Sequence, residues 1–114
     1  VISPILHGLA QGRDPLIVAG DLNLTDQTPD YRRLRSLGLQ DAYRVSGWGF
    51  GFTFPAIPTQ HVMHSLRHFP PFLRIDYVLH SKQITPLRAE VLTSAPGSDH
   101  HPVIADVLLP ACAP

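Results

Sequence analysis

Four short apolar segments set the strongest limit on how this chain can fold. Residues 16–19 form a continuous apolar run, and residues 73–79, 87–93 and 102–109 are short and rich in leucine or β-branched side chains. Segments of this length and composition are typical of β-strands. The run at 16–19 has no polar alternation, so we expect it to be a strand buried on both faces.

Two further segments have the pattern of helices. Residues 2–9 carry apolar side chains at i, i+3, i+4 and i+7. Residues 28–38 begin with Thr28 as an N-cap and end at Gly38. An irregular, proline-rich connection over residues 44–72 separates this helix from the last three strands. The order of elements predicts an α+β (mixed α/β) fold, with helices covering one face of a sheet.

Composition narrows the classes of protein only slightly. The chain has 114 residues, which suits one domain or part of one, and its nine basic and nine acidic residues give no net charge. This balance argues neither for nor against a nucleic-acid partner. No signal-peptide pattern and no apolar run near the roughly 20 residues of a membrane-spanning helix is present, so the cytoplasm is the default compartment. The first residue is Val1, which points to a fragment or a processed form.

Polar side chains with the potential for chemistry interrupt or follow the predicted strands. Asp21 and Asn23 come directly after the strand at 16–19, and on an extended backbone they point to the same side. Asp76 lies inside the apolar segment 73–79, where a charge needs a partner. His100 is a suitable partner, because a carboxylate on one imidazole nitrogen fixes the tautomer. Asp99 then remains free to face a cation such as Mg²⁺.

Each of these side chains also has a plain structural interpretation. Asp21 and Asn23 are consistent with an Asx-type turn, Asp76 with an ion pair to Arg74, and His100 with a surface or capping position. His101 alternates to the other side of the backbone, so we expect a structural role for it.

Three motifs together resemble the C-terminal half of the endonuclease/exonuclease/phosphatase family. They are GDLN at 20–23, RIDYVL at 74–79 and SDHHPV at 98–103, and the resemblance covers roughly residues 1–109. It implies that residues 1–114 form one half of a four-layer αββα sandwich, with a mostly antiparallel sheet and helices on one face.

The resemblance also implies hydrolysis of a phosphodiester or phosphomonoester by water, dependent on Mg²⁺ or Mn²⁺. Asp21 would position or deprotonate the water, and Asn23 would bind the phosphate or the nucleophile. Asp76 would orient His100, which would act as a general base or stabilise the charged transition state. Asp99 would lie at or near the metal. These roles suit phosphoryl transfer, which depends on positioning and charge neutralisation.

The first half of the family pattern, which carries an Asn and a metal-binding Glu, is not matched in this chain. The only glutamate, Glu90, does not stand in the family's metal-binding motif. We therefore expect a fragment with little activity alone, whose inner sheet face is covered by a missing N-terminal half or by a second chain. The alternative is a non-catalytic interaction module that dimerises or pairs through the same face.

The connection at 44–72 holds the remaining candidates. Thr53 is a candidate for substrate binding, although a hydroxyl that stabilises the loop is the simpler interpretation. Trp48 and the phenylalanines at 50, 52 and 54 alternate at period two, which favours packing under the loop over base stacking. His61, His64 and His68 lack acidic support for a metal site, and a solvated segment is the default. The loop does not discriminate nucleic acid, lipid headgroup or inositol phosphate as substrate.

Overall fold

The structure is a computed structural model that describes residues 12, 14–56, 70–94 and 97–112. Its described elements are β1 (Ile17–Asp21), α2 (Pro29–Ser36), β2 (Gln40–Asp41), α3 (Ala42–Ser46), β3 (Asp76–His80), β4 (Thr85–Val91) and β5 (Val103–Leu108). The helix predicted over residues 2–9 lies outside the described residues. The α+β fold class is confirmed.

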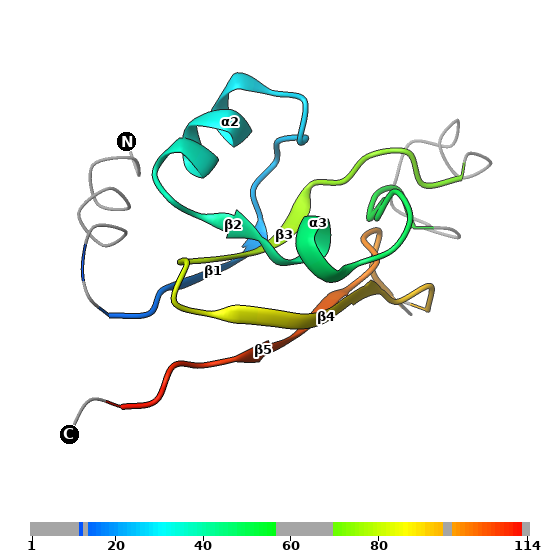
Figure 1. Cartoon of the computed structure of the whole chain (residues 1–114). Helices are drawn as coiled ribbons and strands as arrows, with labels where there is room; N and C mark the ends of the chain where they lie inside the picture. The colour runs from blue at the N-terminus through cyan, green and yellow to red at the C-terminus, as the bar shows by residue number, and fades with distance from the viewer. Residues whose placement is uncertain (1–11, 13, 57–69, 95–96, 113–114) are drawn as a thin grey trace.

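The strands form two antiparallel sheets. One has the order β1-β3-β2, and the other pairs β4 with β5. Helices α2 and α3 lie on the same side of the strands in Figure 1, as predicted for a sheet with helices on one face. None of the helices in the described part of the chain is long and apolar enough to cross a membrane.

Helix α2 forms between the N-cap and the glycine that the sequence predicts as its ends. The Thr28 side chain accepts a hydrogen bond from the backbone N–H of Tyr31, and Pro29 occupies the first turn. Gly38 follows the helix with a φ of 98°, a conformation that favours glycine. The buried face of the helix carries Tyr31, which packs with Leu39, Tyr77 and Leu79 in the core between α2 and the three-stranded sheet.

A polar network is buried beside this core. The Arg74 guanidinium lies 2.6 Å from Asp41 Oδ2 and 3.3 Å from Asp26 Oδ2. The same Asp41 oxygen accepts a hydrogen bond from the Tyr31 hydroxyl at 2.8 Å. The Arg74 guanidinium also lies 4.8 Å from the centroid of the Tyr77 ring. The network ties the residues that precede β3 to α2 and to the start of α3.

Three expectations about the elements need correction. Strand β1 was expected to be buried on both faces but is exposed along most of its length, and among the described residues it pairs only with β3. Asp76 is the first residue of β3 and does not lie inside a strand over residues 73–79, and Leu73 forms an isolated bridge with Phe54. Helix α3 and strand β2 fall in a region where no element was predicted. Asp41 caps α3 by accepting from the N–H groups of Tyr43 and Arg44.

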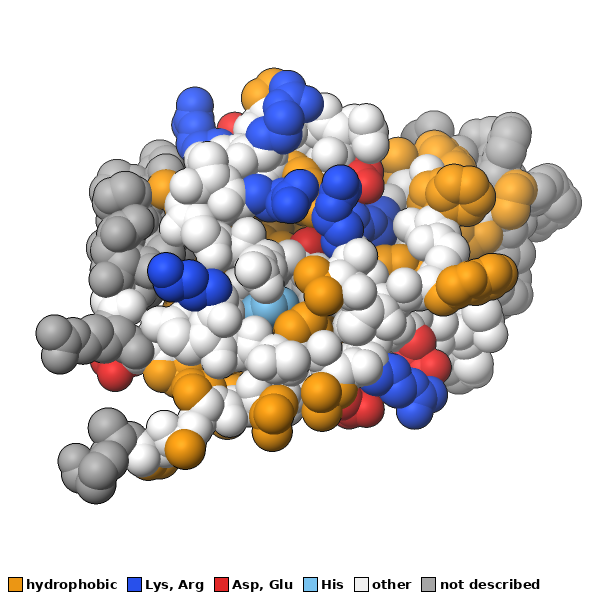
Figure 2. All heavy atoms as spheres, viewed as in Figure 1, with side chains coloured by type: hydrophobic (Ala, Val, Ile, Leu, Met, Phe, Trp, Pro, Cys, Tyr) orange, Lys and Arg blue, Asp and Glu red, His pale blue; other side chains and the backbone are white. Residues whose placement is uncertain are grey.

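Large apolar side chains remain exposed on β4, on β5 and just after β5. They are Leu87, Ile104, Leu108 and Leu109, each more than two-fifths exposed. Figure 2 shows hydrophobic side chains along the lower edge of the molecule, where β5 runs in Figure 1. Such residues are unremarkable singly, but here they group on one sheet and the residues that follow it.

Candidate active site

Two carboxylates face each other at the end of the three-stranded sheet. Asp21 ends β1 and Asp76 begins β3, and the antiparallel register places them directly opposite each other. Like charges in this position repel each other, and a cation or a proton beside them offsets the repulsion. His100 lies there, with Nδ1 2.8 Å from Asp76 Oδ2 and Nε2 3.9 Å from Asp21 Oδ2. Three of the predicted site residues therefore converge.

The segment that carries His100 is fixed by backbone hydrogen bonds to the loop before residue 57. The Asp99 carbonyl accepts from the Ala56 N–H at 2.7 Å, and the Thr53 carbonyl accepts from the His101 N–H at 2.7 Å. The Phe54 ring lies 5.1 Å from the His100 ring, centroid to centroid. Sequence reasoning placed Phe54 under the loop and missed this contact, because the alternation of aromatics does not indicate which ring meets the histidine.

The surroundings of His100 favour its charged form. Burial lowers the pKa of the imidazole, but the hydrogen bond and charge of Asp76, with the charges of Asp21 and Asp99, outweigh this effect. The net result is a pKa above the ordinary value of 6.5. The contact with Asp76 assigns a proton to Nδ1 and directs Nε2 towards Asp21.

A cleft of about 220 Å³ opens beside this cluster. Asp76 and His100 line it together with parts of β1, β3 and the segment before β5. Asp76 and His100 are therefore accessible to a small ligand through this cleft.

The same three side chains have the arrangement of a metal-binding group. One ligand atom from each of Asp21, Asp76 and His100 lies within 4.8 Å of the others. Two carboxylates suit an oxygen-preferring divalent cation. Asp99, the residue predicted to face the metal, is not a member of this group. Its Oδ1 lies 3.9 Å from His100 Nε2, so it stands beside the cluster.

Asn23 lies next to the cluster, but its geometry differs from the prediction. Its φ is 52°, in the left-handed region, so Asp21 and Asn23 do not lie on an extended backbone. The Asn23 N–H donates to Asp21 Oδ1 at 2.8 Å, which is the Asx-type turn considered from the sequence. The turn holds the Asp21 carboxylate by one oxygen and leaves the other facing His100. The phosphate-binding role of Asn23 stays a prediction.

Thr53 does not reach the cleft. Its side chain is fully buried, and Oγ1 accepts a hydrogen bond from the Ile75 N–H at 3.2 Å. The structure therefore favours the loop-stabilising role over substrate binding. His101 is also buried and joins the loop through its backbone, consistent with a structural role.

Arg74 and the arginines of α2 are not members of the cluster of Asp21, Asp76 and His100. Arg74 binds Asp41 and Asp26, whereas Asp76 binds His100, so the alternative of an Arg74–Asp76 pair is wrong. The arginines of α2, at 32, 33 and 35, are exposed, and Figure 2 shows basic side chains over this helix. His61, His64 and His68 lie outside the described residues.

The chain is similar to known proteins both in sequence pattern and in fold. The model of the endonuclease/exonuclease/phosphatase family matches residues 4–100. No curated protein sequence matches the chain closely enough to count as a relative.

Several solved structures share the fold. The mannosyl-6-phosphatase of Bacteroides thetaiotaomicron is 24% identical with a TM-score of 0.68, and the match covers 95% of this chain and 43% of that one. A family protein from the same species is 23% identical with a TM-score of 0.71, covering 96% of this chain and 44% of that one. A family protein from Bacteroides vulgatus is 27% identical with a TM-score of 0.68, covering 86% and 38%. The chain thus spans about two-fifths of the length of these structures.

Proposed function

The chain belongs to the endonuclease/exonuclease/phosphatase family, and we propose on this basis that the protein containing it hydrolyses phosphate esters with a divalent metal ion. Members of this family are in general phosphoesterases or nucleases. The observation that carries the proposal is the meeting of Asp21, Asp76 and His100 at the open ends of two paired strands. The ester is a phosphodiester or a phosphomonoester.

The contacts of these residues support the roles that we propose for them. Asp76 holds His100 through Nδ1, which fixes the direction in which Nε2 points. Asp21 faces Nε2 and is placed to orient an attacking water, or to accept a proton from it. His100 is proposed to act on the phosphoryl group through Nε2, as a general base or by stabilising the negative charge of the transition state. Asn23 is proposed to bind the phosphate.

The metal ion proposed here is Mg²⁺ or Mn²⁺. Asp21 and Asp76 would hold it, with Asp99 close by, and further ligands would come from water or from the rest of the protein. When bound, such an ion neutralises charge on the phosphate and activates water.

The rest of the protein is expected to cover the exposed apolar side chains of β4 and β5. The same surface would also serve an interaction module that pairs with a second chain. The convergence of Asp21, Asp76 and His100 favours the enzyme, because pairing through the sheet does not need this cluster.

The test is an assay of the whole protein with MgCl₂ or MnCl₂ on bis(p-nitrophenyl) phosphate and p-nitrophenyl phosphate. Asp21→Ala and His100→Ala should each lower turnover at least a hundredfold, in line with loss of a charged catalytic group. Asp30→Ala, which removes an exposed carboxylate from α2, is the matched control and should retain turnover. Undiminished turnover in either site variant would refute the proposal.

A further inference from the structure

The loop that follows α3 presents unusually exposed aromatic side chains. Trp48 is 94% exposed and Phe50 is 81% exposed. The expectation that these two rings pack under the loop is therefore wrong. Large aromatic side chains on a surface generally mark a place where something binds. Hydrophobic side chains gather in Figure 2 at the end of the molecule where this loop projects.

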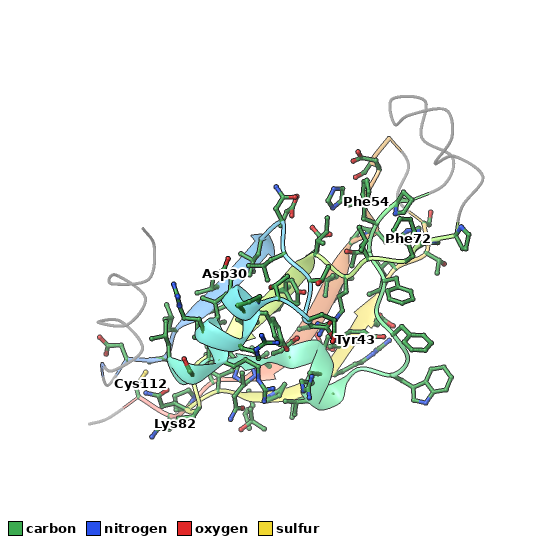
Figure 3. The ribbon with its side chains drawn as sticks, turned by 90° about the horizontal axis from the view of Figure 1, so that it is seen from above. Asp30, Tyr43, Phe54, Phe72, Lys82 and Cys112 are labelled. Atoms are coloured by element: carbon green, nitrogen blue, oxygen red, sulfur yellow. The ribbon has the colours of Figure 1, made fainter. Side chains whose placement is uncertain are left out.

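The loop is firmly supported from below by Tyr43, which lies on α3 (Figure 3). The Tyr43 hydroxyl donates a hydrogen bond to the Trp48 carbonyl. Gly47 and Gly51 lie against the Tyr43 ring. A Cβ atom at Gly47 would come 2.6 Å from the ring, and one at Gly51 would come closer still. The exposed positions of Trp48 and Phe50 therefore belong to a built loop, anchored by contacts that only glycine permits.

Two clefts flank the loop. One of about 520 Å³ lies between the loop and β4, and one of about 330 Å³ lies between the loop and residues 25–27. Phe50 and Phe52 line both clefts, with their rings stacked at 5.2 Å between centroids. Phe54, two residues further along the chain, lies 5.1 Å from the His100 ring, centroid to centroid. Figure 3 shows Phe54 beside Phe72, which lines the smaller cleft.

The polar walls of both clefts carry balanced charges. In the larger cleft, Arg88 and Glu90 form an ion pair at 3.0 Å. In the smaller cleft, the buried Arg74 is paired with Asp26. Each cation that lines the clefts among the described residues thus has an acidic partner.

The pairing of charges in the two clefts favours a sugar over a nucleic-acid strand or an acyl chain as their ligand. A nucleic-acid strand brings one negative charge per nucleotide and needs unpaired cations along its track. An acyl chain needs continuous apolar walls, and both clefts have carboxylate, guanidinium or hydroxyl groups opposite their aromatic rings. A sugar ring has an apolar C–H face and a rim of hydroxyl groups, which matches clefts lined by aromatic rings together with charge-paired hydrogen-bonding groups.

We propose that the aromatic loop and its two clefts bind sugar rings, so that the ester hydrolysed at His100 belongs to a phosphorylated saccharide. The hydrolysis of a saccharide phosphate rests on the proposed function, whereas the binding of sugar rings does not. Stacking on Trp48 and Phe50 supplies the apolar contact, and hydroxyl groups share hydrogen bonds with Arg88 and Glu90.

The binding test titrates the whole protein with neutral trisaccharides, namely mannotriose, maltotriose and cellotriose, and with a thymidine decanucleotide, followed by calorimetry. We expect at least one trisaccharide to bind and to change the emission of Trp48, identified by its absence in Trp48→Phe. Trp48→Ala and Phe50→Ala should each weaken that binding about tenfold, as loss of a stacked apolar surface implies. Val45→Ala is the control, because Val45 is exposed on α3 and lines neither cleft.

The outcomes separate the two proposals. Absence of binding by all three trisaccharides, or binding of the decanucleotide weakened by the same two substitutions, would overturn the saccharide inference. Trisaccharide binding without turnover of any p-nitrophenyl ester would instead overturn the proposed phosphoesterase function and leave the saccharide site standing.

Discussion

Replacement of Arg74 by methionine should lower the free energy of unfolding by about 3 kcal/mol. The Arg74 side chain is 6% exposed, the Asp41 side chain is 0% exposed, and their charged groups meet at 2.6 Å. Removal of one partner from a buried ion pair costs about 3–5 kcal/mol, because the remaining charge stays buried. Asp41 keeps its hydrogen bond from the Tyr31 hydroxyl and its cap of α3, so the lower end of this range applies.

Urea denaturation followed by circular dichroism measures this change. With a slope of about 1–3 kcal/mol/M, the midpoint should fall by about 1–3 M. Arg88→Met is the matched control, since Arg88 and Glu90 are 66% and 42% exposed, and their pair should matter by less than about 1 kcal/mol. Equal losses in the two variants would refute the view that burial makes the Arg74 pair strong. Arg74→Met combined with Asp41→Asn should cost less than the two single changes added together.

Four further predictions concern the site and its supports. Asp76→Asn should lower the pKa of His100, followed by NMR titration of the imidazole; an unchanged pKa would contradict the proposed pairing. Because the folded-state pKa is raised, the stabilisation from this pair is fully present below about pH 6.5 and is lost as the pH rises through the folded pKa, so His100→Gln should flatten this part of the stability profile. Gly51→Ala should destabilise more than Gly38→Ala: both have positive φ, but only at Gly51 does a Cβ meet the Tyr43 ring, and equal melting temperatures would exclude that contact. Thr53→Val should cost about 1–3 kcal/mol in urea denaturation by leaving the Ile75 N–H unpaired, and a neutral effect would show that the hydroxyl is dispensable.

Much of the fold was predictable because its signals are local. The caps of α2 stand at its ends in the sequence, and the apolar runs of β3, β4 and β5 are long enough to indicate strands. Helix α3 has five residues and β2 has two, so neither shows a period. The cap at Asp41 and the glycine at 47 were the available signals for α3.

The site was predictable as a set of residues but not as a geometry. Motifs identified Asp21, Asp76 and His100, yet the opposition of the two carboxylates depends on strand register, which no local pattern reveals. The left-handed backbone of Asn23 and the exposure of Trp48 were likewise not predictable. Asparagine occurs in several turn conformations, and an aromatic alternation fits a buried row as well as a displayed one.

The register between β1 and β3 has a consequence for how the chain tolerates insertions and deletions. Side chains alternate between the two faces of a strand. Loss of one residue from positions 17–19 of β1 would therefore turn Asp21 to the opposite face, although the GDLN motif itself would be unchanged. The homologues that keep both aspartates should therefore show no single-residue length changes inside these strands. Variation in length should gather in the connections, where it does not shift one carboxylate past the other.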